Sequence, residues 1–140
     1  MPKSADSMRR RLLLAAPAVL TTAVYSEAAE GLTSGQVIER IQKNLGVPWR
    51  TPTVDTFKAG GPDTPVQGIA TTFMATFDVL QRASKGGKNF VVTHEPTFYN
   101  HEDKTEEFAN DPVYNAKRDF IKKNRMAVFR FHDHWHARRP

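Results

Sequence analysis

The chain has 140 residues, which is enough for one modest domain and too few for two. It contains no cysteine, so the sequence excludes a disulfide framework, a thiolate zinc site and a cysteine nucleophile. The formal net charge of +5 is partly local, because removing residues 1–28 leaves +3. Since no basic stripe interleaved with aromatic residues follows, we expect no nucleic-acid partner.

Residues 1–28 have the pattern of an export signal. Arg9 and Arg10 precede an uncharged apolar stretch, residues 12–24, which is shorter than the ~20 residues that a membrane span requires. The small residues Ser26 and Ala28, separated by one position, favour cleavage after Ala28. The paired arginines resemble a twin-arginine signal, which exports folded proteins; an ordinary secretory signal or an uncleaved N-terminus is the alternative. We expect an exported protein, periplasmic or extracellular, with no stable membrane span in the mature chain.

The remaining residues, 29–140, are expected to form one α/β metal-binding domain. A first helix is predicted to start near Thr33 and to end at Gly46, because four apolar residues recur at helical spacing between them: Val37, Ile38, Ile41 and Leu45. Residues 54–57 could form a short edge strand. Residues 59–63 predict a turn, and they lack the lysine and hydroxyl of a phosphate-binding loop.

A strand, a helix and a second strand are predicted next. Residues 66–74 form the first strand, Thr76 caps the helix, and Asp78 in the first turn complements the helix dipole. Residues 89–93 then form a short apolar strand. Such strand–helix–strand units are nearly always right-handed, with parallel strands.

A further helix and strand complete the pattern. Asp111 and Pro112 are a cap and a first helical residue, and residues 127–131 form another apolar strand. The predicted fold class is therefore α/β, in the order βαβαβ, with a short, mostly parallel sheet flanked by helices.

All five histidines fall at or after the ends of the last two predicted strands. His94 and Glu95 follow residues 89–93, and a run containing His132, Asp133, His134 and His136 follows residues 127–131. The carboxyl ends of parallel strands meet at one edge of an open sheet, where such folds bind ligands. Histidine is the commonest side-chain metal ligand, so we predict a metal site at this edge.

The backbone at the two strand ends decides which side chains can meet. In a regular strand His94 and Glu95 would point in opposite directions, unless the chain turns before Pro96. The three histidines His132, His134 and His136 would span ~13 Å in an extended strand, too far for one ion. We therefore predict a turn after His132, which would bring His132 and one later group together.

Several nearby polar residues are given a structural interpretation. His101, Glu102 and Asp103 lie in a polar loop and are expected to be surface residues. Trp135 is expected to cover a hydrophobic edge. Asp133 could orient a histidine from behind, or simply be exposed.

Residues 33–136 resemble the Ngg-interacting-factor-three-like proteins, a family with dinuclear metal centres that often carries the label type 2 GTP cyclohydrolase I. The family motif Thr-His-His-Pro followed by an aromatic residue corresponds here to Thr93-His94-Glu95-Pro96-Thr97-Phe98. The preceding strand and helix correspond to residues 69–83. The next family motif, histidine, three residues and aspartate, corresponds to the segment from His132 to His136.

The resemblance implies His94 as a ligand directly and His132 by its position. Glu95 stands in place of the second histidine, and His136 in place of an aspartate that bridges the two metals in the family. An imidazole cannot bridge two cations as a carboxylate does. Met74 stands where many family members have an acidic residue. The family also supplies a further His-x-x-x-Glu ligand pair beyond the matched region, so the domain is expected to be incomplete relative to the family, and ring-shaped homo-oligomers are implied.

These observations give one main functional hypothesis and two rivals. The main one is a metal-dependent hydrolase-like protein that binds Zn, Mn, Fe or Mg and acts on a small ester, amide or phosphoester. Its predicted ligands are His94, Glu95, His132 and His136, with His134 and Asp133 as further ligands or supporting groups. The first rival is a non-catalytic metal-binding or assembly protein with a structural ion. The second is an amidohydrolase or metallo-β-lactamase site on His132-Asp133-His134, which the short remaining chain disfavours.

Overall fold

The computed structural model describes residues 31–138; the predicted export signal, residues 1–28, lies outside them. In chain order the elements are α1 (Ser34–Asn44), β1 (Phe57–Ala59), β2 (Ile69–Thr72), α2 (Phe77–Lys85), β3 (Phe90–Thr93), the 3₁₀ turn η1 (Glu106–Phe108), α3 (Pro112–Lys123), β4 (Ala127–Arg130) and α4 (Asp133–Ala137). No helix among residues 31–138 is both long and apolar enough to cross a membrane.

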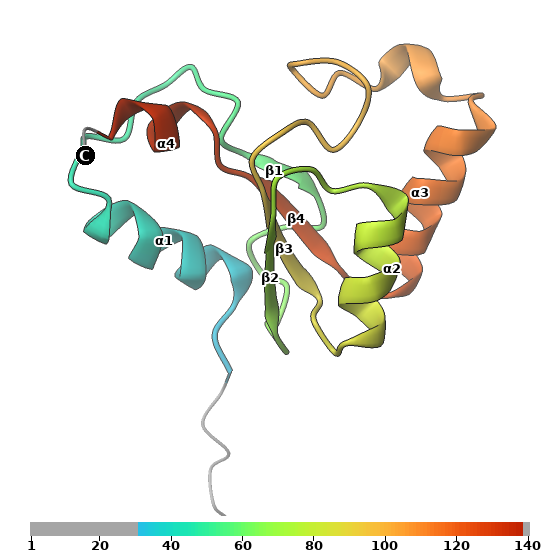
Figure 1. Ribbon diagram of the computed structural model, residues 1–140, viewed down its shortest axis with the longest axis horizontal. Helices are drawn as coiled ribbons and strands as arrows, with labels where there is room; N and C mark the ends of the chain where they lie inside the picture. Colours follow the sequence, from blue (N-terminus) through green and yellow to red (C-terminus); the bar gives the residue numbers. More distant parts are fainter. Residues whose placement is uncertain (1–30, 139–140) are drawn as a thin grey trace, which may run out of the picture.

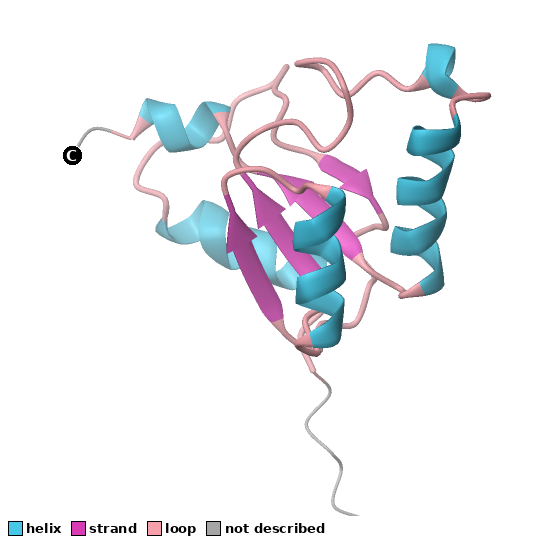
Figure 2. Cartoon of the chain, turned by 45° about the vertical axis from the view of Figure 1, so that its right-hand side comes forward, coloured by secondary structure: helices cyan, strands magenta, loops and turns pink. Residues whose placement is uncertain are grey.

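The four strands form one sheet in the order β1-β4-β3-β2. Strands β2, β3 and β4 are parallel and β1 is antiparallel to β4, so the predicted βαβαβ order and mostly parallel sheet are confirmed. Helices α2 and α3 lie on one face of the sheet, and α1 lies on the other (Figures 1 and 2). This is the three-layer arrangement expected of an α/β fold.

Side chains alternate between the two faces of the central strands and form two separate cores. Val91 and Val128 pack with Leu80 and Ile121 beneath α2 and α3. Phe90 and its neighbours on β4 face the other way and form a second core with α1: Ile38, Ala127 and Phe129. Burial on both faces explains why β3 and β4 are mostly apolar in sequence, up to Thr93 and Arg130 at their ends.

The helix starts follow the sequence signals. Thr33 forms a capping box with Gln36 at α1, and Thr76 accepts the backbone N–H of Val79 at α2. Asp111 caps α3 through the N–H of Tyr114. These side chains satisfy backbone donors that no carbonyl of the same helix can reach, so local chemistry is sufficient to define each helix start.

Two predicted strands differ in extent from the observed ones. Strand β2 is shorter than residues 66–74, because the Asn89 side chain accepts the N–H of Gln67 and donates to the carbonyl of Pro65, in place of a strand ladder. The edge strand β1 spans Phe57–Ala59 and therefore overlaps the predicted residues 54–57 only at Phe57. The N–H of Val54 instead donates to a carboxylate of Asp133, far away in the sequence.

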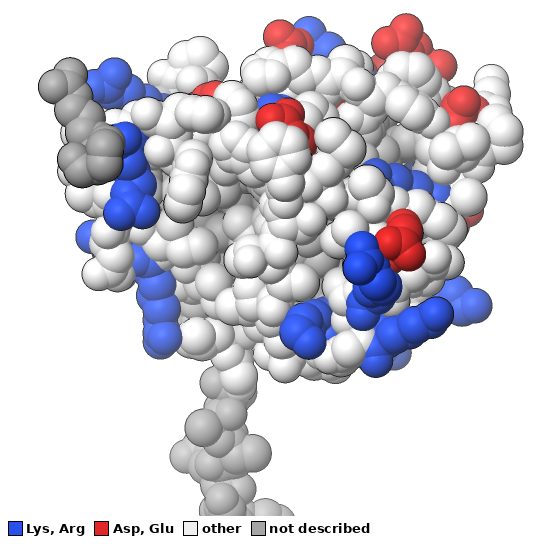
Figure 3. Space-filling model, viewed as in Figure 1, with Lys and Arg blue, Asp and Glu red and all other residues white. Residues whose placement is uncertain are grey.

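Charged side chains are unevenly distributed over the face of the molecule that Figure 3 shows. In the view of Figure 3 the middle of the face carries few charged atoms, and Lys and Arg gather at the lower right. That region holds the C-terminal ends of α2 and α3 (Figure 1), whose last turns carry Arg82, Lys85, Lys122 and Lys123. Basic residues there complement the negative ends of the two helix dipoles.

Candidate metal centre

The two histidine-bearing strand ends lie side by side. Strands β3 and β4 are neighbours in register, and the N–H of Phe131 donates to the carbonyl of Thr93 at 2.8 Å just beyond β4. His94 and His132 therefore leave the sheet together, and their ring centroids are 4.7 Å apart. The predicted convergence of the two strand ends is confirmed.

A short helix brings a third imidazole to the same place. His132 stands at the N-terminus of α4, and the N–H of His136 donates to the carbonyl of His132 at 3.0 Å, which closes one helical turn. Residues four apart in a helix share a face. The two rings consequently lie 4.7 Å apart, so the predicted turn after His132 is also confirmed.

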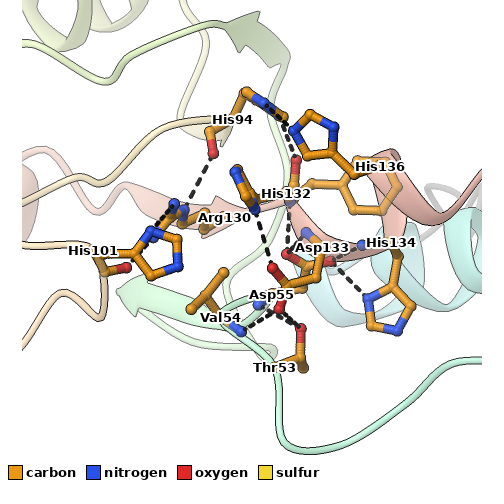
Figure 4. Close-up of polar contacts among 11 residues, drawn as sticks. Thr53, Val54, Asp55, His94, His101, Arg130, His132, Asp133, His134 and His136 are labelled. Carbon is orange, nitrogen blue, oxygen red and sulfur yellow. Dashed lines mark hydrogen bonds and ion pairs between the residues drawn. The ribbon is translucent and has the colours of Figure 1, made fainter.

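The three histidines form a cluster that could hold a metal ion. One ring nitrogen from each of His94, His132 and His136 lies within 4.8 Å of the other two (Figure 4). The Nε2 atoms of His94 and His136 are 3.2 Å apart. Two nitrogens bound at Zn–N distances of 2.0–2.1 Å in tetrahedral geometry would be ~3.4 Å apart, so this spacing fits a shared cation.

Hydrogen bonds set the tautomers of two of these rings. His94 Nδ1 faces the carbonyl of Phe131 at 3.2 Å, and His132 Nδ1 faces Asp133 Oδ1 at 3.0 Å. A ring nitrogen that faces an oxygen acceptor carries the proton, which leaves a lone pair on Nε2. Each ring thus presents its Nε2 as a ligand atom. The Asp133 contact is the carboxylate–histidine pairing that commonly supports metal-binding histidines.

Asp133 also ties the start of α4 to the segment before β1. Its Oδ2 accepts the hydroxyl of Thr53 at 2.8 Å and the N–H of Val54 at 3.0 Å. Burial acts to raise the pKa of Asp133, but the hydrogen bonds from His132, Val54 and Thr53 outweigh it and lower the pKa to about 2. The carboxylate therefore stays charged beside His132 throughout the physiological range.

A buried carboxylate that the sequence analysis missed holds the whole turn in place. Asp55 Oδ1 accepts the N–H groups of His132 and Asp133 at 2.6 and 2.9 Å. Its Oδ2 accepts both the N–H and the ring Nδ1–H of His134, at 2.9 and 2.7 Å. Asp55 lies in an irregular segment with no motif, so the sequence carried no signal for it.

His134 does not join the cluster. Its Nε2 accepts the N–H of Arg50 at 2.8 Å, its Nδ1–H donates to Asp55, and its ring stacks on Trp49 with centroids 3.7 Å apart. Both ring nitrogens are used and the residue is buried, so its ring points away from His94 (Figure 4). The structure does not combine His132 and His134 into the His-x-His site of the second rival.

Glu95 also lies outside the three-histidine cluster. Its N–H donates to the carbonyl of Phe73 at 2.7 Å, while the N–H of His94 donates to Thr72 at 3.2 Å. Both residues lie in a bend that follows β3, and this bend brings His94, but not Glu95, into the cluster.

Arg130 is a second residue that the sequence analysis did not identify, and it supports the loop that runs from His94 to His101. Its guanidinium is fully buried and donates to the backbone carbonyls of His94 and His101. A charged residue inside the apolar run of β4 was the available sequence signal. His101 and Glu102 are exposed as predicted.

The prediction that Asp103 is a solvated surface residue is wrong. Its side chain is 2% exposed, forms an ion pair with Lys58 at 3.8 Å, and accepts the N–H of Phe98 at 2.5 Å. Burial raises the pKa of Asp103 and lowers that of Lys58. The acidic composition of the loop concealed this one inward-facing carboxylate.

An apolar cavity of about 480 Å³ opens beside the cluster. Its walls include the ring of His94 and three aromatic residues, Phe73, Phe131 and Trp135. Trp135 contacts Phe131 edge-on with centroids 6.2 Å apart, yet it remains 54% exposed. Phe73 is 67% exposed. A small molecule bound here would lie next to the three imidazoles.

No known family matches the sequence of this chain, and neither does any curated protein. Solved structures do match it. The hypothetical protein SA1388 of Staphylococcus aureus aligns with a TM-score of 0.60 and 16% identity over 76% of this chain. A Bacillus cereus protein related to NIF3 aligns with a TM-score of 0.61 and 18% identity, also over 76%. Reduced HcgD from Methanocaldococcus jannaschii aligns with a TM-score of 0.57 and 19% identity over 74%.

The match covers only part of each neighbour. This chain spans about 30% of SA1388, 29% of the Bacillus cereus protein and 40% of HcgD. At these identities the likeness concerns the fold. The resemblance to the Ngg-interacting-factor-three-like proteins, inferred from the histidine motifs, is thereby confirmed for the fold, and this chain has the architecture of part of a NIF3-related protein.

Proposed function

We propose that this chain binds one divalent cation through His94, His132 and His136. The observation that carries the proposal is the convergence of three ring nitrogens within 4.8 Å from two strand ends and a helix. Asp133 and the carbonyl of Phe131 favour the Nδ1-protonated tautomers of His132 and His94. Solved structures with the same fold include a protein related to NIF3, which is consistent with this reading.

The ligand set favours zinc. Three imidazoles without a carboxylate suit zinc and related transition metals better than magnesium, which prefers oxygen ligands. With His136 in the position of the family's bridging aspartate and Glu95 outside the cluster, a single ion is the simplest stoichiometry. Three protein ligands are also the usual number in catalytic zinc sites, which keep a position open.

We further propose that the site is hydrolytic. When bound, a divalent cation supplies a Lewis acid that polarises an ester, amide or phosphoester oxygen and lowers the pKa of a coordinated water. The chain's own residues would orient the reactants. Asp133 holds the ring of His132, and the aromatic walls of the 480 Å³ cavity, Phe73 and Trp135, would hold an apolar part of the substrate beside His94.

A non-catalytic role is the second candidate. His136 and Trp135 are both exposed, so a second chain could cover the ion and complete its coordination. The ion would then be structural and would promote homo-oligomers. Such a site would be closed to substrate, which makes the two candidates separable by experiment.

Zinc titration of metal-stripped protein tests the binding step. We expect about one tightly bound zinc per chain by calorimetry and mass spectrometry, and loss of that site in His94→Ala and His136→Ala. The control is His101→Ala, which removes an exposed histidine outside the cluster and should leave the stoichiometry unchanged. Equal zinc binding by all of these variants would refute the proposed ligand set.

Hydrolysis assays test the catalytic step. The zinc-loaded chain should hydrolyse 4-nitrophenyl acetate or bis(4-nitrophenyl) phosphate, and His136→Ala should reduce the rate to the background level. Zinc binding without any hydrolysis, accompanied by zinc-dependent oligomers in light scattering, would instead favour the structural ion.

We also propose that residues 1–28 direct export by the twin-arginine route. The test fuses these residues to green fluorescent protein, which fluoresces in the periplasm only when it is exported folded. Fluorescence should appear there with the natural sequence and disappear when Arg9 and Arg10 are both replaced by lysine. Export that survives this double substitution would exclude the route.

A further inference from the structure

A second cavity, of about 720 Å³, lies on the α2/α3 side of the sheet. It is bounded by the first turns of α2 and α3 and by the segment that follows His94 and Glu95, residues 96–99. None of the three clustered histidines lines it. Its volume falls within the ~300–1,000 Å³ typical of small-molecule sites.

The walls of this cavity are unusually apolar for an exposed surface. Seven large hydrophobic side chains are exposed among residues 31–138, and four of these line the cavity: Met74, Phe77, Tyr99 and Val113. Val113 is 66% exposed. Apolar side chains that gather at one concave place, instead of being scattered singly, indicate a binding surface.

One cation lies in these apolar walls. Lys117 is the only charged residue that lines the cavity. Its ammonium donates to the backbone carbonyl of Thr97 and lies 5.5 Å from the centre of the Phe98 ring. An ammonium has three donor hydrogens, and this is the only hydrogen bond found for it in the described part of the chain. Burial lowers the pKa of Lys117, with Asp103 opposing that shift.

A second polar group of the lining is also unsatisfied. Thr97 is 2% exposed, and its hydroxyl is buried without a hydrogen-bond partner among the described residues. Such a group is costly to leave unpaired. Lys117 therefore offers unused donors in the lining, and the complementary ligand group is one that only accepts hydrogen bonds, such as a carboxylate.

The N-terminal ends of the two helices beside the cavity also favour a negatively charged ligand group. The first residues of α2 and α3, Phe77 and Pro112, both line it, so the positive ends of two helix dipoles face this region. The nearest acidic cap, Asp111, is already engaged by the hydroxyl of Tyr99 and the N–H of Tyr114.

We propose that this cavity binds an amphipathic carboxylic acid, with its carboxylate paired to Lys117 and its apolar body against Phe77 and Val113. The site is separate from the metal centre. Binding therefore does not require His94, and this independence distinguishes failure of the present proposal from failure of the proposed metal function.

The probe is decanoate, titrated into the full chain by calorimetry and by two-dimensional amide NMR. We expect saturable binding of one decanoate, with shifts in the signals of Thr97 and Val113. Lys117→Met, which keeps the apolar stem, should weaken decanoate binding at least about 10-fold, because it removes a charge-assisted pair. The same Lys117→Met substitution should change the affinity for neutral decanol little. Lys122→Met, on the same helix but outside this cavity, is the matched control.

A second variant keeps the test decisive if Lys117→Met is unstable. Val113→Asp changes an exposed position at the cavity wall, where folding is insensitive, and places a carboxylate against the ligand. It should abolish decanoate binding. The proposal is overturned by the absence of saturable decanoate binding, by equal affinity for decylamine, or by undiminished decanoate binding in Val113→Asp. Decanoate binding that survives in His94→Ala supports it.

Discussion

Asp55→Asn should destabilise the domain strongly, because one buried carboxylate satisfies four donors at the start of α4. Each of its oxygens accepts two hydrogen bonds. The amide of asparagine keeps one acceptor oxygen, so either placement loses two of the four bonds and turns an NH₂ group toward N–H donors. Hydrogen bonds to charged groups contribute ~1.5–3 kcal/mol each, so we expect a loss of about 3 kcal/mol. That loss raises the unfolding constant roughly 100-fold.

Urea unfolding of metal-free protein, followed by far-UV circular dichroism, measures this effect. The matched control is Asp119→Asn, since Asp119 is a largely exposed carboxylate paired with the adjacent Arg118. That variant should stay within ~0.5 kcal/mol of the natural chain. If Asp55→Asn also stays within this range, the four contacts do not stabilise the turn and the reasoning fails.

Three further variants test other parts of the fold. Gly60→Ala should lower the free energy of unfolding by ~2–3 kcal/mol, because φ of Gly60 is +66° and a Cβ there would lie 2.6 Å from a backbone oxygen. The control is Gly61→Ala, whose Cβ would meet no atom within 4 Å, and it should be nearly neutral in the same urea assay. Leu80→Ala should cost ~2–5 kcal/mol by urea unfolding, since Leu80 is fully buried; a smaller loss would mean that the core collapses around the gap. The hydrogen bond from the Tyr114 N–H lowers the pKa of Asp111 below its ordinary 3.8, so Asp111→Ala should lower the melting temperature near neutral pH. The difference in melting temperature between the variant and the natural chain should fade as the pH falls below 3.8. A difference that stays constant with pH would contradict this role of Asp111.

Local sequence signals predicted α1, α2 and α3 well. Thr33, Thr76 and Asp111 each cap a helix at the expected place, because an N-cap bond joins residues only two or three positions apart. The apolar runs of β3 and β4 were equally informative, since burial on both faces leaves few polar positions. The limits of the edge strands β1 and β2 were predicted less accurately, because bonds to distant side chains help to fix them.

Part of the candidate metal site was also predictable. His94 and His132 were paired correctly, because parallel neighbouring strands deliver their ends to one edge. Glu95 and His134 were included by sequence proximity. The structure leaves both outside the cluster: Glu95 lies in the bend after β3, and Asp55 and Arg50 hold the two ring nitrogens of His134.

The amino-acid sequence by itself determined the order of elements, the parallel core of the sheet and the edge at which the histidines gather. These features depend on periodicity and on contacts between near neighbours in the chain. Only the tertiary structure decided which histidines face one another, that Asp55 and Arg130 hold their backbones, and that Lys117 lies in an apolar cavity. Those outcomes depend on groups up to about 80 positions apart, as for Asp55 and His134, and no local pattern records such a pairing.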